Sequence, residues 1–288
     1  MSRVLKDIYT HGHHQSVVSQ HAKRTVQSSA AFILPLLEKQ HTKLLDVGCG
    51  PGSITIGFSP LCKQVEALDY SEAAVKMAQE ASKVSCNVSR NCFIINVVQE
   101  LKNVTIRQGS VYELPFEDNS FDVVYTHQVL QHLKYPIDAL KEMKRVVKPG
   151  GFIGARDADY SSMLAYPNLR GIDEWRRIYR ATCYKNDAEP DAGRYLLKWC
   201  MDSGFAEEQV KYTMSVVPYV TQAEREDWGL AWRTRALESD FAKQAVHYGL
   251  ASREELQEIS ETWVEFTKAP GAVFYYVNGE VLAQKPAL

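Results

Sequence analysis

The feature that most constrains the fold is a glycine-rich segment that directly follows an apolar run. Lys43 to Val47 reads as a buried strand, and the chain continues Gly-Cys-Gly-Pro-Gly through Gly52. Glycine has no Cβ, so Gly48 and Gly50 let the backbone turn sharply and approach a ligand closely. In open α/β sheets, ligands bind at the carboxyl ends of the strands. The segment therefore predicts a ligand-binding turn between a strand and a helix.

The residues after this turn alternate between helix and strand patterns. Helices are expected at 53–61, 71–82 and 136–147, and strands at 64–69, 104–108, 121–126 and 151–156. Alternation at this spacing indicates βαβ units and a parallel sheet. The chain is therefore expected to be an α/β protein with a Rossmann-like, mostly parallel sheet.

Several segments fall outside this rhythm. Residues 28–39 read as a helix despite Pro35, and 84–100 read as an insertion. A helix at 194–203 is expected to end at Gly204, and 211–220 to form a further strand. Asn278-Gly279 between two apolar runs is typical of a β-hairpin turn.

Two acidic residues near the glycine turn favour a cationic ligand. Asp69 ends the second expected strand, where a carboxylate can accept the ribose hydroxyls of an adenosine-containing cofactor. A dinucleotide site has the spacing G-x-G-x-x-G, whereas this chain has G-x-G-x-G with Ser53 at the last position of that pattern. Asp46, two positions before Gly48, would attract a sulfonium and an ammonium group. S-adenosylmethionine (SAM) is therefore favoured over a nicotinamide dinucleotide.

The composition is that of an ordinary globular protein. Basic side chains number 33 and acidic ones 35, giving a formal net charge of -2. This balance does not suggest a nucleic-acid partner. No segment has the ~20 apolar residues of a membrane span or the apolar stretch of a signal peptide. We therefore expect a cytoplasmic enzyme without nucleic-acid or membrane partners, acting as a monomer or homodimer.

Neither the cysteines nor the histidines predict a metal site. The cysteines have irregular spacing without a C-x-x-C pair, so they are interpreted as reduced and mostly buried. His11, His13 and His14 cluster, but their spacing in a polar segment does not present a convergent tetrahedral set. Contact of this segment with SAM or substrate is the preferred interpretation, and no metal is expected.

From 43 to 157 the sequence resembles the class I SAM-dependent methyltransferases, in particular the ubiquinone and menaquinone biosynthesis methyltransferases that act on small molecules. The matching segments are LLDVGCGPG at 44–52, ALDYSEAAV at 67–75, GSVYELPFEDNSFDVVY at 109–125, HQVLQHL at 127–133 and RVVKPGGF at 145–152. The resemblance implies a seven-stranded sheet with helical cap insertions. It also implies SAM as the cofactor and methyl transfer to a small molecule, possible acceptors including secondary metabolites.

The resemblance implies roles for the matched residues. The three glycines of the turn would border the methionine part of SAM, and Asp69 would hold the ribose. Where the family commonly has Asp, this chain has Ser110, an uncharged partner for the adenine. Arg24 is suited to the SAM carboxylate. The full set of expected cofactor residues is Tyr9, Arg24, Asp46, Gly48, Gly50, Gly52, Asp69, Tyr70, Gly109, Ser110, Val111, Thr126 and His132.

Catalytic residues are harder to infer, because SAM itself carries the reactivity. His127 follows the fourth expected strand and is the candidate base, unless it only shapes the loop. Asp157 ends the fifth strand beside Arg156; the two are expected to orient a substrate, to pair with each other, or to contact the cap. His127 and Asp157 are the two catalytic candidates.

The expected organisation is a core interrupted by caps. It comprises a lid at 1–27, a SAM-binding core at 28–159, a cap at 160–193, a core continuation at 194–220, a helical cap at 221–270 and C-terminal strands at 271–288. Trp175, Trp228 and Trp232 fall in the caps, where they either pack in a core or line a substrate pocket.

Two other functions remain open from the sequence. A SAM-binding regulatory protein without catalysis would carry the same glycine turn. A nicotinamide-dependent oxidoreductase would share the sheet, although the glycine spacing and Asp46 argue against it.

Overall fold

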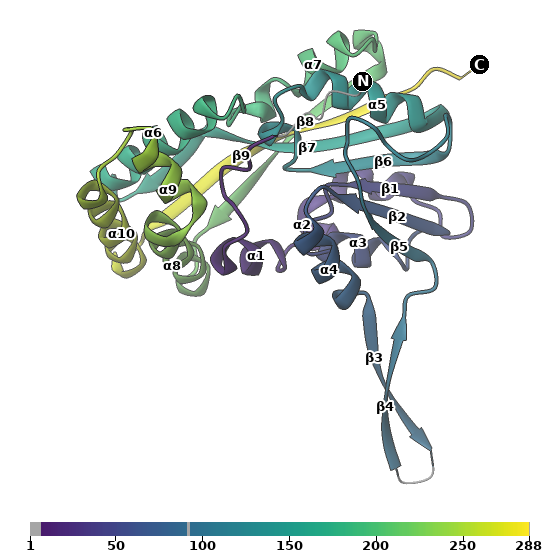
Figure 1. Cartoon of the computed structure of the whole chain (residues 1–288), viewed down its shortest axis with the longest axis horizontal. Helices are drawn as coiled ribbons and strands as arrows, with labels where there is room; N and C mark the ends of the chain where they lie inside the picture. Colours follow the sequence, from purple (N-terminus) through teal and green to yellow (C-terminus); the bar gives the residue numbers. More distant parts are fainter. Residues whose placement is uncertain (1–6, 91–92, 288) are drawn as a thin grey trace. The chain divides into compact units, whose positions relative to one another are not determined.

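The central element of the computed structural model is a mostly parallel β-sheet (Figure 1). The model describes residues 7–90 and 93–287, and within them the sheet has seven strands in the order β5-β2-β1-β6-β7-β9-β8. The strands are β1 (Lys43–Val47), β2 (Gln64–Asp69), β5 (Val104–Gln108), β6 (Phe121–His127), β7 (Val147–Tyr166), β8 (Val210–Tyr219) and β9 (Val273–Gln284). β1 pairs in parallel with both β2 and β6, and β2 with β5. The expected Rossmann-like α/β sheet is confirmed.

The strand order reverses at β1. From β1 the chain proceeds outward through β2 to β5, and then returns to the other side of β1 as β6. In an open α/β sheet, such a reversal opens a crevice at the carboxyl ends of the two central strands. The glycine turn follows β1 directly and therefore lies at this crevice.

Contacts divide the chain into two compact units, each assembled from separated segments. We call one the glycine-turn unit; it comprises His21–His127, Lys141–Gly154 and Leu282–Leu288. The other, the aromatic unit, comprises Met1–Gln20, Gln128–Leu140 and Ala155–Val281. Each unit is described by itself below.

The glycine-turn unit packs short helices on its strands. These are α2 (Val26–Ser29), the 3-10 helix η1 (Ala31–Leu36), α3 (Ser53–Phe58), α4 (Glu72–Ala81) and part of α5 (Pro136–Val146). Ile33, Phe58 and Tyr125 are fully buried in one core cluster. Ala67 and Ala78 belong to another cluster that includes residues of α4. Ser71 caps α4 by accepting the Ala74 N–H, as its sequence position predicts.

The aromatic unit is built mainly from helices. Its α-helices are α1 (Gln15–His21), α6 (Arg170–Lys185), α7 (Leu196–Asp202), α8 (Gln222–Glu238), α9 (Asp240–His247) and α10 (Arg253–Lys268). Its 3-10 helices are η2 (Leu130–His132), η3 (Ala192–Arg194) and η4 (Glu207–Gln209). The last residue of α1, His21, is the first residue of the glycine-turn unit. α8, α9 and α10 form a helical group in Figure 1. Trp175, Trp232 and Trp263 are fully buried in its core. For these tryptophans, core packing is therefore the interpretation that the structure supports.

The helix expected at 28–39 is wrong. The chain forms α2 and then η1, with Pro35 inside the 3-10 helix. Proline lacks an N–H and its ring clashes with the carbonyl four residues earlier, so an α-helix does not continue through this position.

The expected hairpin at Asn278-Gly279 is also wrong, because both residues lie inside the single strand β9. Gly279 is needed for a close approach of two backbone segments. A Cβ added there would lie 1.9 Å from the carbonyl oxygen of Gly193. An Asn-Gly pair marks a turn only when both residues adopt positive φ, and Gly279 is not among the glycines with positive φ.

Of the segment 84–100, read as an insertion, residues 84–90 and 93–100 belong to a two-stranded ribbon. β3 (Lys83–Arg90) and β4 (Phe93–Glu100) pair antiparallel with each other and are not part of the seven-stranded sheet (Figure 1). The strand expected at 151–156 is longer than predicted, since β7 runs from Val147 to Tyr166.

The thiols that the structure describes fit the reduced, buried interpretation. Cys49, Cys62, Cys183 and Cys200 are free and buried. Burial raises the pKa of the Cys62, Cys183 and Cys200 thiols to about 12, so they are not reactive thiolates at neutral pH. Cys92 and the side chain of Cys86 lie outside the described part of the chain.

Candidate cofactor site

The glycine turn carries three glycines in the left-handed region, each with a different surrounding. The φ angles are 74° at Gly48, 54° at Gly50 and 83° at Gly52. A Cβ on Gly52 would lie 2.8 Å from the Ala78 Cβ, so this glycine allows α3 to begin against α4. A Cβ on Gly50 would meet nothing within 4 Å, so the backbone there borders open space. The turn thus combines a glycine in close packing, Gly52, with one that borders open space, Gly50, beside which a ligand can lie.

Asp69 is tied to this turn through its carboxylate. Its Oδ2 accepts the Gly50 N–H at 2.9 Å, and its Oδ1 accepts the Ser71 N–H at 2.8 Å. Two backbone donors therefore fix the carboxylate at the end of β2. A carboxylate has about four lone-pair sites, so a carboxylate oriented in this way is suited to accept hydrogen bonds from a ribose diol.

Asp46 lies on β1 and is buried, with 3% of its surface exposed. Its Oδ2 accepts the Thr55 hydroxyl at 2.6 Å. Burial raises the pKa of Asp46 to about 7; the Thr55 hydrogen bond lowers it and the charge of Asp69 raises it. A nearby cation would favour the ionised form. Thr55 was not predicted from the sequence, because nothing in the spacing of residues 46 and 55 marks them as partners.

The residues expected at the adenine lie in the segments after β2 and β5. Tyr70 is 53% exposed, and its carbonyl accepts the Gln108 side-chain amide. The Gly109 N–H donates to the Asp69 carbonyl, which joins the ends of the two strands. Ser110 Oγ accepts the Tyr112 N–H at 3.2 Å, and Val111 is buried. These residues thus lie on strand ends that hydrogen bonds connect to Asp69.

The segment around Arg24 also reaches the glycine turn. Ser53 Oγ, at the start of α3, donates to the His21 carbonyl, and the Arg24 N–H donates to the same carbonyl. Val26 packs against Gly57 of α3, where an added Cβ would lie 2.8 Å from its side chain. The structure therefore places the backbone of Arg24 beside the helix that the turn begins.

At the end of β6, Thr126 and His127 are both buried. Thr126 pairs with Val47 of β1, so it lies at the edge where the glycine turn begins. Its hydroxyl has no hydrogen-bond partner among the described residues. The His127 ring is parallel to the Tyr125 ring, with centroids 6.5 Å apart.

Tyr9 and His132 meet in the aromatic unit. Their rings are edge to face with centroids 4.8 Å apart. The Gln131 side-chain amide donates to His132 Nε2 at 3.0 Å. His11 is buried between two tyrosines, with Nε2 at 2.7 Å from the Tyr179 hydroxyl and 3.1 Å from that of Tyr160. The N-terminal segment is therefore held in this unit by side chains far away in sequence.

Asp157 and Arg156 do not form the pair that the sequence left open. Arg156 Nε binds Glu280 Oε1 at 3.0 Å, and its guanidinium also donates to Ser215 Oγ. Asp157 is fully buried, and its Oδ1 accepts the Gln131 N–H. Burial raises the pKa of Asp157 to about 7, although the Gln131 N–H and the charge of Arg156 lower it. Glu280 could not be found from sequence, because it is 124 positions from Arg156.

The three clustered histidines have separate environments. His14 contacts Ser16 and Glu238, His11 contacts the two tyrosines, and His13 lies beside Tyr9. Among residues 7–90 and 93–287, no group of three or more His, Cys, Asp or Glu side chains is arranged to hold a metal. No helix in the same residues is both long and apolar enough to cross a bilayer.

Together, the sheet with its reversal at β1, the open glycine turn and the fixed acid after β2 define a nucleoside-binding α/β enzyme of the methyltransferase class. Comparison with known proteins agrees. The methyltransferase domain profile matches residues 45–154. An uncharacterized methyltransferase of Schizosaccharomyces pombe is 30% identical over 280 residues, covering 96% of each chain. A demethylmenaquinone methyltransferase of Staphylococcus aureus is 36% identical over 137 residues, covering 46% of this chain and 50% of the relative.

Solved structures support the same fold. A crystal structure described as a putative methyltransferase from Bacillus halodurans aligns with a TM-score of 0.55 and 20% identity, covering 89% of this chain and 98% of the other. The chain therefore belongs to the methyltransferase family, and it is a SAM-dependent methyltransferase with the class I fold. The residues of the glycine turn fit this cofactor, since the Asp69 carboxylate is fixed beside the open backbone at Gly50 and a buried acid of raised pKa, Asp46, precedes the turn.

Proposed function

We propose that this methyltransferase methylates a small molecule, and that secondary metabolites are among its acceptors. The observation that carries the proposal is the Asp69 carboxylate, fixed by the N–H groups of Gly50 and Ser71 beside an open turn. This arrangement suits an adenosyl group bound at the turn. The name of the Staphylococcus aureus relative gives demethylmenaquinone as its substrate, which supports a metabolite rather than a macromolecule as the acceptor.

In this proposal, different residues around the turn bind different parts of the cofactor. Gly48, Gly50 and Gly52 border the methionine part, and Asp46 attracts its positive charges. Arg24 binds the carboxylate with its planar guanidinium. Asp69 holds the ribose, while Tyr70, Gly109, Ser110 and Val111 surround the adenine. Tyr9, Thr126 and His132 complete the proposed set.

SAM supplies an activated methyl group, and the protein aligns the acceptor with it and excludes water. An acceptor that must lose its proton on taking up the methyl group would pass that proton to a base. His127 is the proposed base, because it ends β6 and a neutral imidazole accepts a proton near pH 7. Asp157 is the second candidate, since burial keeps its pKa near 7. A buried group with a pKa near the working pH suits proton transfer.

The function is tested by incubating the protein with methyl-labelled SAM and a metabolite extract. We expect label in a low-molecular-weight product and formation of S-adenosylhomocysteine (SAH). SAH binding without label transfer to any extract component would instead indicate a regulatory SAM-binding protein. We expect a monomer or homodimer located in the cytosol, and size-exclusion chromatography tests the oligomeric part.

The role of His127 is tested by separating turnover from binding. His127→Ala should lower turnover by about a hundredfold or more, as loss of a general base does, while SAH affinity stays within about twofold. The pH dependence of turnover should also lose its acid limb. Unchanged turnover at every pH would reduce His127 to a residue that shapes the loop.

A further inference from the structure

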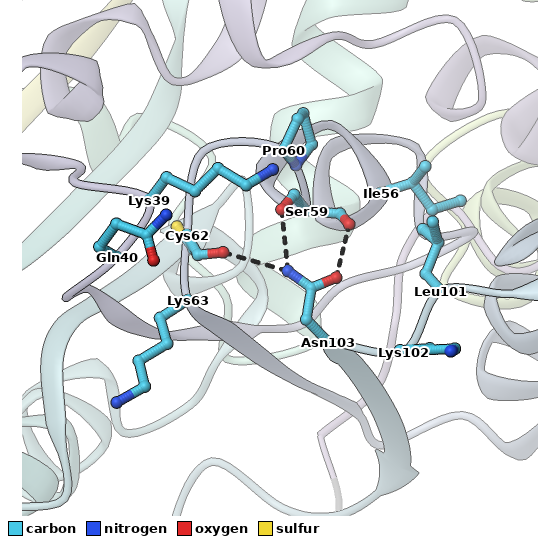
Figure 2. Close-up of a pocket in the computed structure, with 10 residues that line it drawn as sticks. All are labelled: Lys39, Gln40, Ile56, Ser59, Pro60, Cys62, Lys63, Leu101, Lys102 and Asn103. Carbon is cyan, nitrogen blue, oxygen red and sulfur yellow. Dashed lines mark hydrogen bonds between the residues drawn. The ribbon is translucent and has the colours of Figure 1, made fainter.

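A second cavity lies in the glycine-turn unit, at the opposite end of the strands from the glycine turn. Its walls come from the segments that precede β1, β2 and β5 and from the end of α3 (Figure 2). Its volume is about 640 Å³. The lining residues are Lys39, Gln40, Ile56, Ser59, Pro60, Cys62, Lys63, Leu101, Lys102 and Asn103. Since β1 and β2 have five and six residues, with a rise of about 3.3 Å each, the cavity lies on the order of 15–20 Å from the turn.

Asn103 organises the wall of this cavity. Its Nδ2 donates to the carbonyls of Ser59 at 2.8 Å and Cys62 at 3.1 Å, and its Oδ1 accepts the Ser59 hydroxyl at 2.7 Å. Figure 2 shows these three bonds converging on the Asn103 amide. The carbonyl oxygens of Ser59 and Cys62 are thereby hydrogen-bonded within the cavity wall. The loop 59–62 is thereby fixed to the start of β5.

The charged side chains that line the cavity are lysines. Lys39, Lys63 and Lys102 are all exposed, and none of the described residues that line the cavity is acidic. Among the described residues, no carboxylate lies within ion-pair distance of the three ammonium groups. Figure 2 shows the Lys39 ammonium directed towards Pro60, while Lys63 and Lys102 extend in other directions. Lysine stems are flexible, so the positions of these ammonium groups can adjust when an anion binds.

Part of the remaining lining is apolar. Ile56, Pro60 and Leu101 contribute carbon surface to the same cavity. The volume exceeds what a single phosphate needs and lies within the range of small-molecule sites. Positive charge beside apolar surface suits a ligand that carries phosphate groups on an organic body.

We propose that this cavity is a second binding site, for a phosphorylated small molecule of the nucleoside phosphate type. Lys39, Lys63 and Lys102 bind its phosphates, and Ile56, Pro60 and Leu101 contact its organic part. The site is distinct from the cofactor site, because the two lie at opposite ends of β1 and β2 and share no residue. The overall charge of -2 does not oppose this, since the positive charge is local.

The test is a calorimetric titration of the full chain with ATP and, separately, with pyrophosphate. Saturating SAH is present throughout, so that the adenosine of ATP does not bind at the glycine turn. The variant is Lys39→Gln/Lys63→Gln/Lys102→Gln. The matched control is Lys185→Gln/Lys211→Gln/Lys268→Gln, which removes the same charge from exposed lysines outside the cavity.

We expect ATP to bind the wild type more tightly than pyrophosphate does, and the cavity variant to lose at least tenfold in ATP affinity. The control variant should stay within twofold. Absence of ATP binding at millimolar concentration, or an equal loss in both variants, would overturn the proposal. Binding of anionic phospholipid vesicles or single-stranded DNA without binding of ATP would likewise overturn it. SAH affinity measured in the same samples reports on the cofactor site independently.

Discussion

The two units of this methyltransferase position their side chains by different means. In the glycine-turn unit, backbone groups position the side chains of the site. The Gly50 and Ser71 N–H groups fix the Asp69 carboxylate, and positive φ angles shape the turn. In the aromatic unit, side chains from distant segments hold one another, as His11 does with Tyr160 and Tyr179. A site built on local backbone geometry leaves a pattern in the sequence, whereas one built on long-range side-chain packing does not.

The largest change in the free energy of unfolding is expected for a substitution in the core of the aromatic unit. Trp232 is fully buried, and its ring centroid lies 4.4 Å from that of Trp175. Trp232→Ala should lower the free energy of unfolding by about 3–5 kcal/mol, because it leaves a large cavity. Urea denaturation measures the change. The control is Trp199→Ala, a partly exposed residue that stacks on Tyr195. An equal cost for both variants would contradict the assignment of Trp232 to a packed core.

A second substitution tests why strand β9 has a glycine at position 279. The Cβ of Gly279→Ala would collide with the Gly193 carbonyl, so we expect a loss of about 1–3 kcal/mol from overpacking. Gly249→Ala is the comparison, since its Cβ would meet nothing within 4 Å and only the positive φ is unfavourable. Thermal unfolding should show the larger shift for Gly279→Ala. The reverse order would mean that the two segments separate easily.

The pH dependence of SAM binding sharpens the account of Asp46. A bound cation favours the carboxylate, so binding lowers the pKa of Asp46 from about 7 and releases a proton. Affinity should therefore fall as pH drops below 7, by up to about tenfold per pH unit (roughly 1.4 kcal/mol), and level off above 7. Calorimetry at several pH values measures this. Asp46→Asn should remove the dependence, and an identical profile in that variant would assign it to another group.

The smallest effect is expected for the β3–β4 ribbon. Its strands pair with each other and not with the main sheet. Replacing residues 85–98 by Asn-Gly should change the free energy of unfolding by no more than about 0.5 kcal/mol, as for surface changes. SAH affinity should also be unchanged. A loss of SAH binding would show that the ribbon supports the glycine-turn unit.

The sequence predicted the glycine-turn unit well because its signals are local. Local sequence patterns indicated the strand at 43–47, the glycine turn and the strand that ends at Asp69. The structure has β1, the turn and β2 where they were expected. The helix expected at 28–39 failed for a local reason, since Pro35 stops an α-helix there. Other failures occurred where a distant partner decides the outcome. Gly279 lies within a strand because Gly193 approaches it, and Arg156 pairs with Glu280. Thr55 was not predicted as a partner of Asp46, because a single threonine in a helix does not indicate which side chain its hydroxyl will bind.

The most direct measurement is the calorimetric affinity of SAH for the wild type and for Asp69→Ala, with Asp69→Asn as the matched neutral variant. If the fixed carboxylate binds the ribose, Asp69→Ala loses about 1.5–3 kcal/mol, since hydrogen bonds to a charged group are of this size. Asp69→Asn should fall between the two. An affinity for Asp69→Ala within twofold of the wild type, in a protein with an unchanged unfolding temperature, would contradict the placement of the cofactor at the glycine turn.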